Sequence, residues 1–189
     1  NIVTMINTIK PYGRCEKICG KGRILPAFPG AGGCIEGGIL DAQLLPRAIQ
    51  PTTFGEIGGR KSSREEALAY IFRKSHIPYQ IVPEMHHWQI SHLGVIIPLA
   101  DAYYQSRHPE KICANEKLMT LTAYRMKKNL KWIAQKGMLC PAKLYMIKDM
   151  PTGMLAGVLS RVYQSEFGNR FLYRHAMHAP EEFQRLHQE

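Results

Sequence analysis

The spacing of apolar residues changes character near Pro83. Before this proline, short apolar runs alternate with glycines, prolines and turn residues, as in strands and short helices. After Met85, apolar residues recur at helical intervals with few breaks. The sequence therefore predicts an α+β protein of two parts: a mixed α and β part over residues 1–84 and an all-helical part over residues 85–189.

The helical part contains three long predicted helices. The first spans residues 86–105 and includes Pro98, whose missing N–H should bend it. The second spans residues 115–136, has the clearest amphipathic pattern, and ends before Gly137. The third runs from Pro151 to about residue 166, and shorter helices are predicted over 169–177 and 180–187. The positions expected to face the core are Met119, Ala123, Met126, Leu130 and Ile133 in the second helix, and Leu155, Val158, Leu159 and Val162 in the third.

The first part of the chain reads as strands and short helices. We predict strands over residues 2–6, 23–27 and 79–82, a helix over 12–19, and a flexible glycine-rich turn over 29–33. Residues 39–45 and 48–57 alternate as two paired strands do, with Pro46 between them. Ser62 and Ser63, each followed three residues later by a glutamate, form overlapping capping boxes. The helix that they begin has an apolar face of Leu68, Ile71 and Phe72.

Composition excludes several classes of protein. Hydrophobic residues make up 45% of the chain, enough for a core, so disorder is not expected. No apolar run approaches the roughly 18 residues of a membrane span, and no charged-then-apolar leader is present. The five cysteines are odd in number and sparse, which favours reduced thiols and a cytoplasmic location. Their spacing does not suit zinc, so no metal site is expected.

The formal net charge of +10 is unevenly distributed. Residues 107–148 hold ten basic residues and two acidic ones. This charge would attract nucleic acid, anionic lipid or a phosphorylated cofactor, although the solvated face of a helix has the same composition. No helix-turn-helix, RNP-like or zinc-finger pattern accompanies this charge, and the aromatic residues are not interleaved with the lysines as stacking platforms would need. The sequence therefore favours neither nucleic acid nor a membrane as a partner.

Three stretches resemble the ketopantoate reductase family: residues 24–32 (ILPAFPGAG), 50–59 (QPTTFGEIGG) and 98–103 (PLADAY). Residues 5–8 (MINT) look like that family's strand ending in an asparagine beside the nicotinamide. The resemblance covers nearly the whole chain and thins after Lys111. It implies the latter part of a Rossmann-type domain, then a helical domain like that at the C-terminus of 6-phosphogluconate dehydrogenase. It also implies NADP as cofactor and the reduction of a 2-keto acid or a related carbonyl.

The resemblance places most of the cofactor site outside this sequence. The family's phosphate-binding turn, G-x-G-x-x-G after a first strand, is expected upstream, since the chain opens within a predicted strand at Asn1. The glycines at 30–33 have the wrong spacing, and no helix pattern follows them. Asn7 would then be the cofactor-binding residue of this chain, and the 189 residues alone would be inactive. An ordinary turn residue at a strand end is the alternative for Asn7.

The chain departs from the family in the helix over residues 86–105. The family's catalytic lysine falls at Gln89, or at Ile90 with a shift of one residue. Reduction of a ketone needs a group that stabilises the developing negative charge and one that supplies a proton. We therefore expect Gln89 and His92 to be the catalytic residues, with His92 as the proton donor. A core or interface histidine is the alternative for His92.

Glu56, Leu93 and Ile97 are the candidates for substrate binding. Glu56 follows a predicted strand, where an exposed charge on an edge strand is the alternative. Leu93 and Ile97 stand where the family has asparagines, so we expect a less polar substrate than ketopantoate. The family also uses a serine and a glutamate near the C-terminus, for which the candidates are Ser160 or Ser165 and Glu181 or Glu182.

A second class of function fits the same sequence. The missing lysine favours a non-catalytic helical module that dimerises or binds a partner. In either case we expect a homodimer formed through the helical part. Absence of any nucleotide affinity, together with a dimer, would distinguish this module from a reductase.

Overall fold

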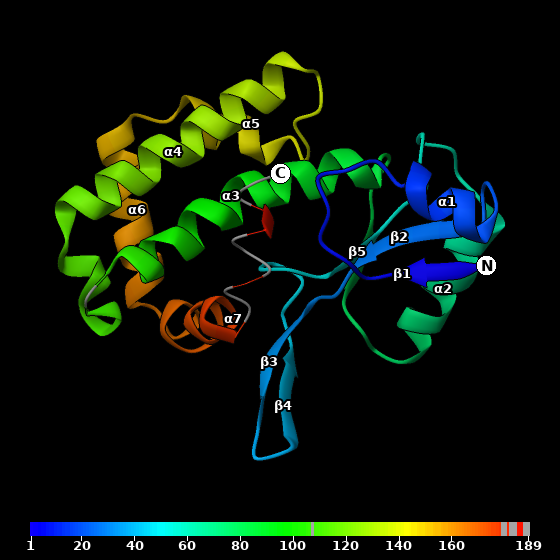
Figure 1. The fold of residues 1–189 in the computed structure, drawn as a ribbon, viewed down its shortest axis with the longest axis horizontal. Helices are drawn as coiled ribbons and strands as arrows, with labels where there is room; N and C mark the ends of the chain where they lie inside the picture. Colours follow the sequence, from blue (N-terminus) through cyan, green and yellow to red (C-terminus); the bar gives the residue numbers. More distant parts are fainter. Residues whose placement is uncertain (107, 179–180, 182–184, 187–189) are drawn as a thin grey trace. The chain divides into compact units, whose positions relative to one another are not determined.

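A computed structural model describes residues 1–106, 108–178, 181 and 185–186 of the chain (Figure 1). The chain forms two compact units, Asn1–Gln89 and Ile90–Glu189. The division falls inside helix α3 (Met85–Gln105), close to the change in apolar spacing at Pro83. Every described strand belongs to the first unit, and the described elements of the second unit are helical. The predicted α+β class is confirmed.

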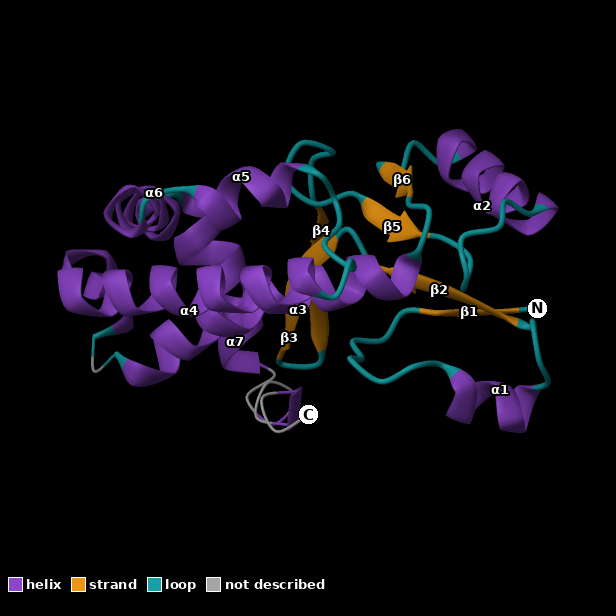
Figure 2. Ribbon diagram, turned by 90° about the horizontal axis from the view of Figure 1, so that it is seen from above, coloured by secondary structure: helices purple, strands orange, loops and turns teal. Residues whose placement is uncertain are grey.

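A small mixed sheet lies at the centre of the first unit (Figure 2). Its strands, in spatial order, are β1 (Ile2–Thr4), β2 (Ile24–Phe28), β5 (Thr52–Phe54) and β6 (Tyr79–Ile81). β1 runs parallel to β2, and β5 runs parallel to β6, but β2 and β5 are antiparallel. The carboxyl ends of β1 and β2 therefore lie at one end of the sheet, and those of β5 and β6 lie at the other.

A separate hairpin of β3 (Ala31–Glu36) and β4 (Ile39–Leu44) extends away from this sheet (Figure 1). Gly37 and Gly38 join its strands with φ values of 58° and 80°, a conformation that glycine adopts without strain. Two predictions were wrong here. Residues 31–33 of the predicted turn belong to β3, and residues 39–44 pair with β3 rather than with 48–57. The tight Gly37–Gly38 turn brings the two neighbouring runs together, so the later strand β5 is left to pair with β2 and β6.

Helix α2 (Ser63–Lys74) covers the sheet through a small apolar core. The Ser62 hydroxyl accepts a hydrogen bond from the Glu65 backbone N–H, and the Ser62 backbone N–H donates to the Glu65 carboxylate, which confirms the capping box predicted at Ser62. Ser63 is the first residue of the helix. Ala69 and Phe72 are buried against Ala27 and Phe54. Ile71 is 55% exposed, so its predicted place on the apolar face was wrong. The short helix α1 (Gly13–Cys19) ends at Gly20, as its sequence predicted.

The second unit is built from packed helices. After α3, they are η1, a 3-10 helix (Pro109–Ala114), α4 (Glu116–Gln135), α5 (Lys143–Asp149), α6 (Thr152–Gln164), η2, a π-helix (Phe167–Leu172), and α7 (Tyr173–His178). α4 packs against both α5 and α6. The predicted core positions of α4 are all buried, and Leu155 and Leu159 are buried in α6. Val158 is 41% exposed, so that position was predicted wrongly. The predicted helix over 180–187 lies mostly outside the described residues.

Helix α3 passes through Pro98 without ending. Proline has no N–H, so the carbonyl of Gly94, four residues earlier, loses its helical hydrogen bond. The side-chain amide of Asn129, on α4, donates to this carbonyl at 3.3 Å. A Cβ atom at Gly94 would lie 2.7 Å from Ile133 Cδ1, so the missing side chain also lets α3 and α4 approach closely. None of the described helices is long and apolar enough to span a membrane.

Candidate functional site

Gln89 ties the start of α3 to the segment that follows β1. Its Nε2 donates to the carbonyl oxygen of Ile6 at 2.9 Å, and its Oε1 accepts a hydrogen bond from the Tyr12 hydroxyl at 2.7 Å. Only 1% of Gln89 is exposed. Because both ends of the amide are engaged and buried, a substrate could reach this side chain only if the 6–12 segment moved.

Two further side chains of the first turn of α3 hold the same region. His86 Nε2 lies 2.9 Å from the carbonyl oxygen of Ile9. Because a carbonyl oxygen can only accept, Nε2 carries a hydrogen and is the donor of this hydrogen bond. The Trp88 ring packs against Phe28, at the end of β2, with centroids 5.4 Å apart. The start of α3 is therefore fixed to the segments that leave both β1 and β2.

Asn7 lies within the segment that Gln89 holds. It follows β1, is partly buried, and stands next to Ile6, whose carbonyl is bound by Gln89. Parallel strands bring their carboxyl ends together, and ligands of α/β proteins bind at such edges. Two predicted site residues, Asn7 and Gln89, are thus brought together although 82 positions separate them in the sequence.

Tyr12 was missed by the sequence analysis. It is 3% exposed and closes the hydrogen-bonded group by donating to Gln89. Burial raises the pKa of its hydroxyl above the ordinary value, and the hydrogen bond to Gln89 offsets only part of that rise. The hydroxyl therefore remains a neutral donor near pH 7. No local pattern marks Tyr12, because its partner lies 77 residues away.

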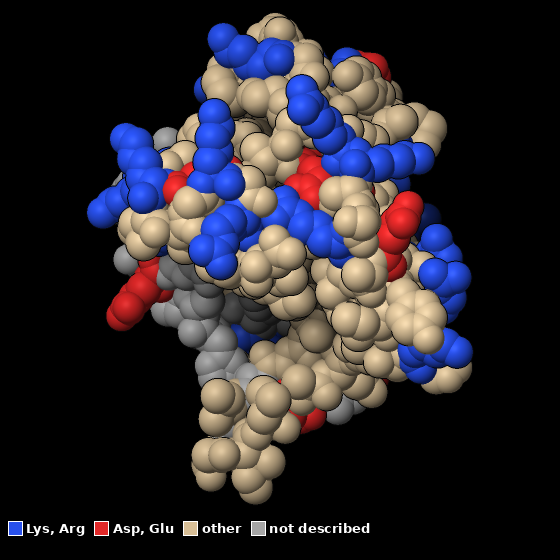
Figure 3. All heavy atoms as spheres, turned by 90° about the vertical axis from the view of Figure 1, so that its right-hand side faces the viewer, with Lys and Arg blue, Asp and Glu red and all other residues tan. Residues whose placement is uncertain are grey.

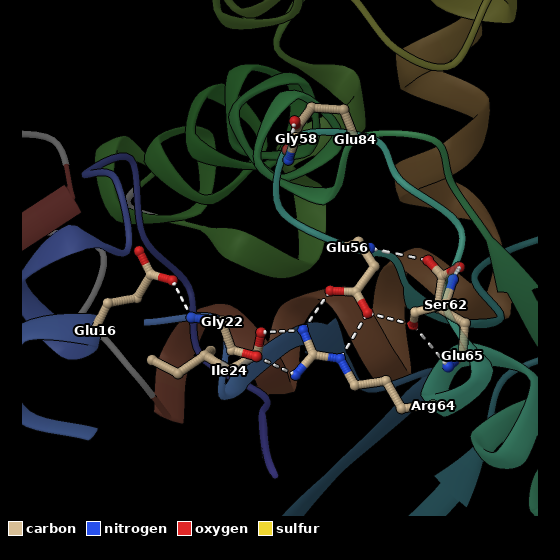
Figure 4. A network of polar contacts seen from close by, with 9 residues as sticks. All are labelled: Glu16, Gly22, Ile24, Glu56, Gly58, Ser62, Arg64, Glu65 and Glu84. Atoms are coloured by element: carbon tan, nitrogen blue, oxygen red, sulfur yellow. Dashed lines mark hydrogen bonds and ion pairs between the residues drawn. The ribbon is translucent and has the colours of Figure 1, made fainter. Parts of the chain in front are cut away.

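Glu56 is held in a different network, shown in Figure 4. Arg64 Nε donates to Glu56 Oε1 at 2.6 Å, a second guanidinium nitrogen contacts Oε2, and the Ser62 hydroxyl donates to Oε1. Arg64 also donates to the carbonyl oxygens of Gly22 at 2.7 Å and Ile24 at 3.0 Å. Hydrogen bonding from Arg64 lowers the pKa of the Glu56 carboxyl, with burial acting against it. Glu56 is 7% exposed, so it is neither the exposed charge nor an open ligand.

Strand direction explains why Glu56 and Asn7 do not share a site. Phe54 pairs with Ala27, and β5 runs against β2, so residues after Phe54 pass the start of β2. The contacts of Arg64 with Gly22 and Ile24 place Glu56 at that start. Asn7 follows the end of β1, which is parallel to β2. Glu56 and Asn7 therefore lie at opposite ends of the sheet and are not brought together.

The other predicted site residues of α3 lie in the second unit. His92 and Ile97 are partly buried, whereas Leu93 is 2% exposed and belongs to the core. Ser91 is fully buried: its hydroxyl donates to the carbonyl oxygen of Met138 at 3.2 Å and accepts the Cys140 N–H at 3.0 Å. The residues on either side of His92 are thus held in place, Ser91 by hydrogen bonds and Leu93 by burial in the core.

The remaining candidates do not form a recognisable site. Ser160 donates to the carbonyl oxygen of Cys113 at 2.9 Å, and Ser165 bonds backbone groups at the end of α6. Glu181 is exposed, and Glu182 lies outside the described residues. No cluster of metal-ligating side chains is found among the described residues. No family model matches this sequence, and no curated protein or solved structure is similar enough to count as a match.

Proposed function

We propose that this chain is a portion of a nicotinamide-dependent oxidoreductase that resembles ketopantoate reductase and reduces a 2-keto acid or a related carbonyl. The observation that carries the proposal is the hydrogen bond from Gln89 to the Ile6 carbonyl. It joins the start of α3, where the family has its catalytic lysine, to the segment of Asn7, where the family binds the nicotinamide. Two positions that matter in the family are therefore neighbours in the first unit of this chain.

The described residues fit one end of an NADP molecule better than the other. Asn7, at the carboxyl ends of two parallel strands, offers a side-chain amide with both a donor and an acceptor, which suits a carboxamide. The cofactor, bound in its reduced form NADPH, would supply the hydride. The glycines at 30–33 lead into β3 and do not open a helix, so among the described residues no glycine-rich turn receives the pyrophosphate. NADP binding would therefore depend mostly on residues other than these.

His92 is the candidate proton donor. Ketone reduction leaves negative charge on oxygen and requires a proton, and an imidazole titrates near neutral pH. Gln89 cannot supply a proton, and its amide is already bonded to Ile6 and Tyr12. We therefore assign Gln89 the role of positioning the 6–12 segment. The partly buried Ile97, in place of an asparagine, favours a substrate less polar than ketopantoate.

The test is NADPH binding by the natively expressed polypeptide, whose intact mass defines its length. Nucleotide fluorescence would be titrated with the wild-type protein, Asn7→Ala, and Asn169→Ala as a matched control on an exposed asparagine of the second unit. The proposal predicts binding that Asn7→Ala weakens about tenfold and the control leaves unchanged. His92→Ala should then retain nucleotide affinity and lose turnover of keto acids. Failure of the native polypeptide to bind either NADPH or NADH would rule out the proposal.

The second candidate function is a non-catalytic helical module. The full engagement of the Gln89 amide and the absence of lysine from α3 favour it. Such a module would dimerise without nucleotide affinity. Sedimentation of the protein with and without NADPH separates the two functions, since only the reductase would respond to the nucleotide.

A further inference from the structure

The outer face of α4 combines exposed aromatic and basic side chains. The buried side of this helix includes Met119, Met126 and Leu130. The opposite side shows Tyr124, 56% exposed, and Trp132, 54% exposed. The exposed lysines on the same side are Lys117, Lys128 and Lys131. Intervals of three and four residues place all five on one stripe of the helix, away from its packed face.

The charge of this stripe is unopposed over a long segment. From Lys117 to Lys148 the sequence contains eight Lys and Arg residues and no Asp or Glu. Three of the eight have polar partners: Arg125 with Asp101, Lys127 with Thr152, and Lys148 with Asp149. Lys128 and Lys131 have no ion pair within the described part of the chain. The nearest acidic residue along α4 is Glu116, in its first turn.

Positive charge alone does not distinguish α4 from the rest of the molecule. Figure 3 shows Lys and Arg side chains spread over another face, where Asp and Glu are fewer. What distinguishes α4 is that two exposed aromatic rings flank its lysines. Tyr124 and Trp132 are eight residues apart, which corresponds to about 12 Å along a helix. The Lys136 ammonium lies 5.8 Å from the centroid of the Trp132 ring and adds a cation at that end.

We propose that this stripe binds single-stranded nucleic acid. Bases would stack on Tyr124 and Trp132, and phosphates would contact Lys128 and Lys131 between them. Stacking platforms combined with a basic track are the usual means of binding single strands without sequence preference. The proposal is independent of the oxidoreductase function. The rings and the lysines are separated in the sequence, and they lie on one face only because the segment is helical.

A bilayer surface is the less suitable occupant. Interfacial helices bury a continuous apolar stripe and keep their lysines on the opposite side. On α4, Lys128 and Lys131 lie between the two rings, and Leu121, 38% exposed, is the aliphatic residue of the stripe. Insertion of the rings would therefore carry two charges toward the hydrocarbon. A duplex is also disfavoured, because its bases are already stacked on one another.

The test measures binding of fluorescently labelled oligo(dT) by anisotropy, with the full 189-residue chain. Intrinsic fluorescence provides a second readout, since Trp132 is exposed and Trp88 is only 3% exposed. We expect quenching of Trp132 on binding. The two lysine–phosphate contacts, of Lys128 and Lys131, predict that log K falls with log salt with a slope of about −1.4 on a single strand.

Variants on and off the stripe make the test specific. Trp132→Leu should weaken binding by at least about fivefold, the loss of one stacked base. Lys128→Ala should weaken binding and reduce the salt slope by about 0.7. The matched controls are Tyr145→Leu and Lys143→Ala, an exposed tyrosine and lysine on α5, and both should bind as wild type. Circular dichroism would verify that each variant is folded.

Three results would overturn the proposal. The first is absence of binding at low salt. The second is binding that Trp132→Leu and the α5 controls weaken equally, which would indicate diffuse charge rather than a stripe. The third is tighter binding to phosphatidylglycerol vesicles than to oligo(dT), which would identify a membrane surface.

Discussion

The first unit is fixed by individual polar pairs between segments far apart in sequence, whereas the second is fixed by a repeating apolar face. In the first unit, Arg64 donates to two backbone carbonyls and a carboxylate, and Gln89 joins α3 to the segment that follows β1. In the second, α4 packs through a series of buried apolar positions at helical spacing. The difference matters for the effect of mutations. Removing one partner of a polar pair leaves the other buried without a hydrogen bond, whereas truncating an apolar side chain lowers stability in proportion to the cavity that it leaves.

The largest effect should come from the seam of α4. Leu130→Ala removes a side chain that is 0% exposed and should lower the free energy of unfolding of the second unit by about 3 kcal/mol. Leu121→Ala, at a position 38% exposed on the same helix, should change the free energy of unfolding by no more than about 0.5 kcal/mol. Urea denaturation followed by far-UV circular dichroism measures both. Equal losses for the two variants would show that the seam does not hold this unit.

A smaller loss should follow when the main polar pair of the first unit is broken. Arg64→Met leaves the Glu56 carboxylate without its cation, and we expect a loss of about 2 kcal/mol in the first unit. Trp88, packed on Phe28, provides a fluorescence readout within that unit. Arg73→Met, an exposed arginine of α2, is the matched control and should change stability little. If both variants unfold at the same urea concentration, polar pairing does not stabilise this unit.

The second unit also contains a polar pair, Asn129 and the Gly94 carbonyl, whose loss should destabilise it as the loss of a polar pair destabilises the first unit. Asn129→Ala leaves the Gly94 carbonyl without a donor and should cost about 1 kcal/mol. With Pro98→Ala in the background, the backbone N–H is restored, and the same change at 129 should cost less. A double-mutant cycle by urea denaturation gives the coupling. Additive losses would show that Asn129 does not serve this carbonyl.

The smallest effect should appear on acidification. Hydrogen bonding from Arg64 holds the pKa of Glu56 below its ordinary value of 4.5, so the folded state binds this proton less readily than the unfolded state. The resulting stability is present above pH about 4.5 and is lost as the pH falls through the lower folded pKa. Glu56→Gln should lose this dependence and show a shallower decline of stability in acid. Identical slopes for the two proteins in acid denaturation would contradict the assignment.

The sequence predicted the second unit better than the first, for a physical reason. Helical periodicity is local, so the buried positions of α4 and the capping of α2 could be read directly. Strand pairing is not local. The alternating apolar pattern of residues 39–45 is compatible with pairing to the strand before it or to the strand after it. The tight turn at Gly37–Gly38 selects the strand before it, β3. The exposed Val158 shows that even a good helical pattern leaves the width of the apolar face uncertain by one position.

The candidate site was predicted only in part. Asn7 and Gln89 were both selected from the family resemblance, and the hydrogen bond to Ile6 makes them neighbours. Glu56 was selected because it follows a strand, but strand ends lie at opposite ends of a mixed sheet, and direction cannot be read from one strand alone. Tyr12 carried no signal, since its importance comes from a partner on another element.

The hydrogen bond from Asn129 to Gly94 has a consequence for sequence divergence. A proline in the middle of a helix is tolerated here because an amide on the neighbouring helix donates a hydrogen bond to the carbonyl that would otherwise be left without a donor. The two positions should therefore covary among related chains: where 98 is not proline, the selection for an amide at 129 disappears. Glycine at 94 should not covary with these two positions, because what requires it is the close approach of the Ile133 side chain and not the hydrogen bond.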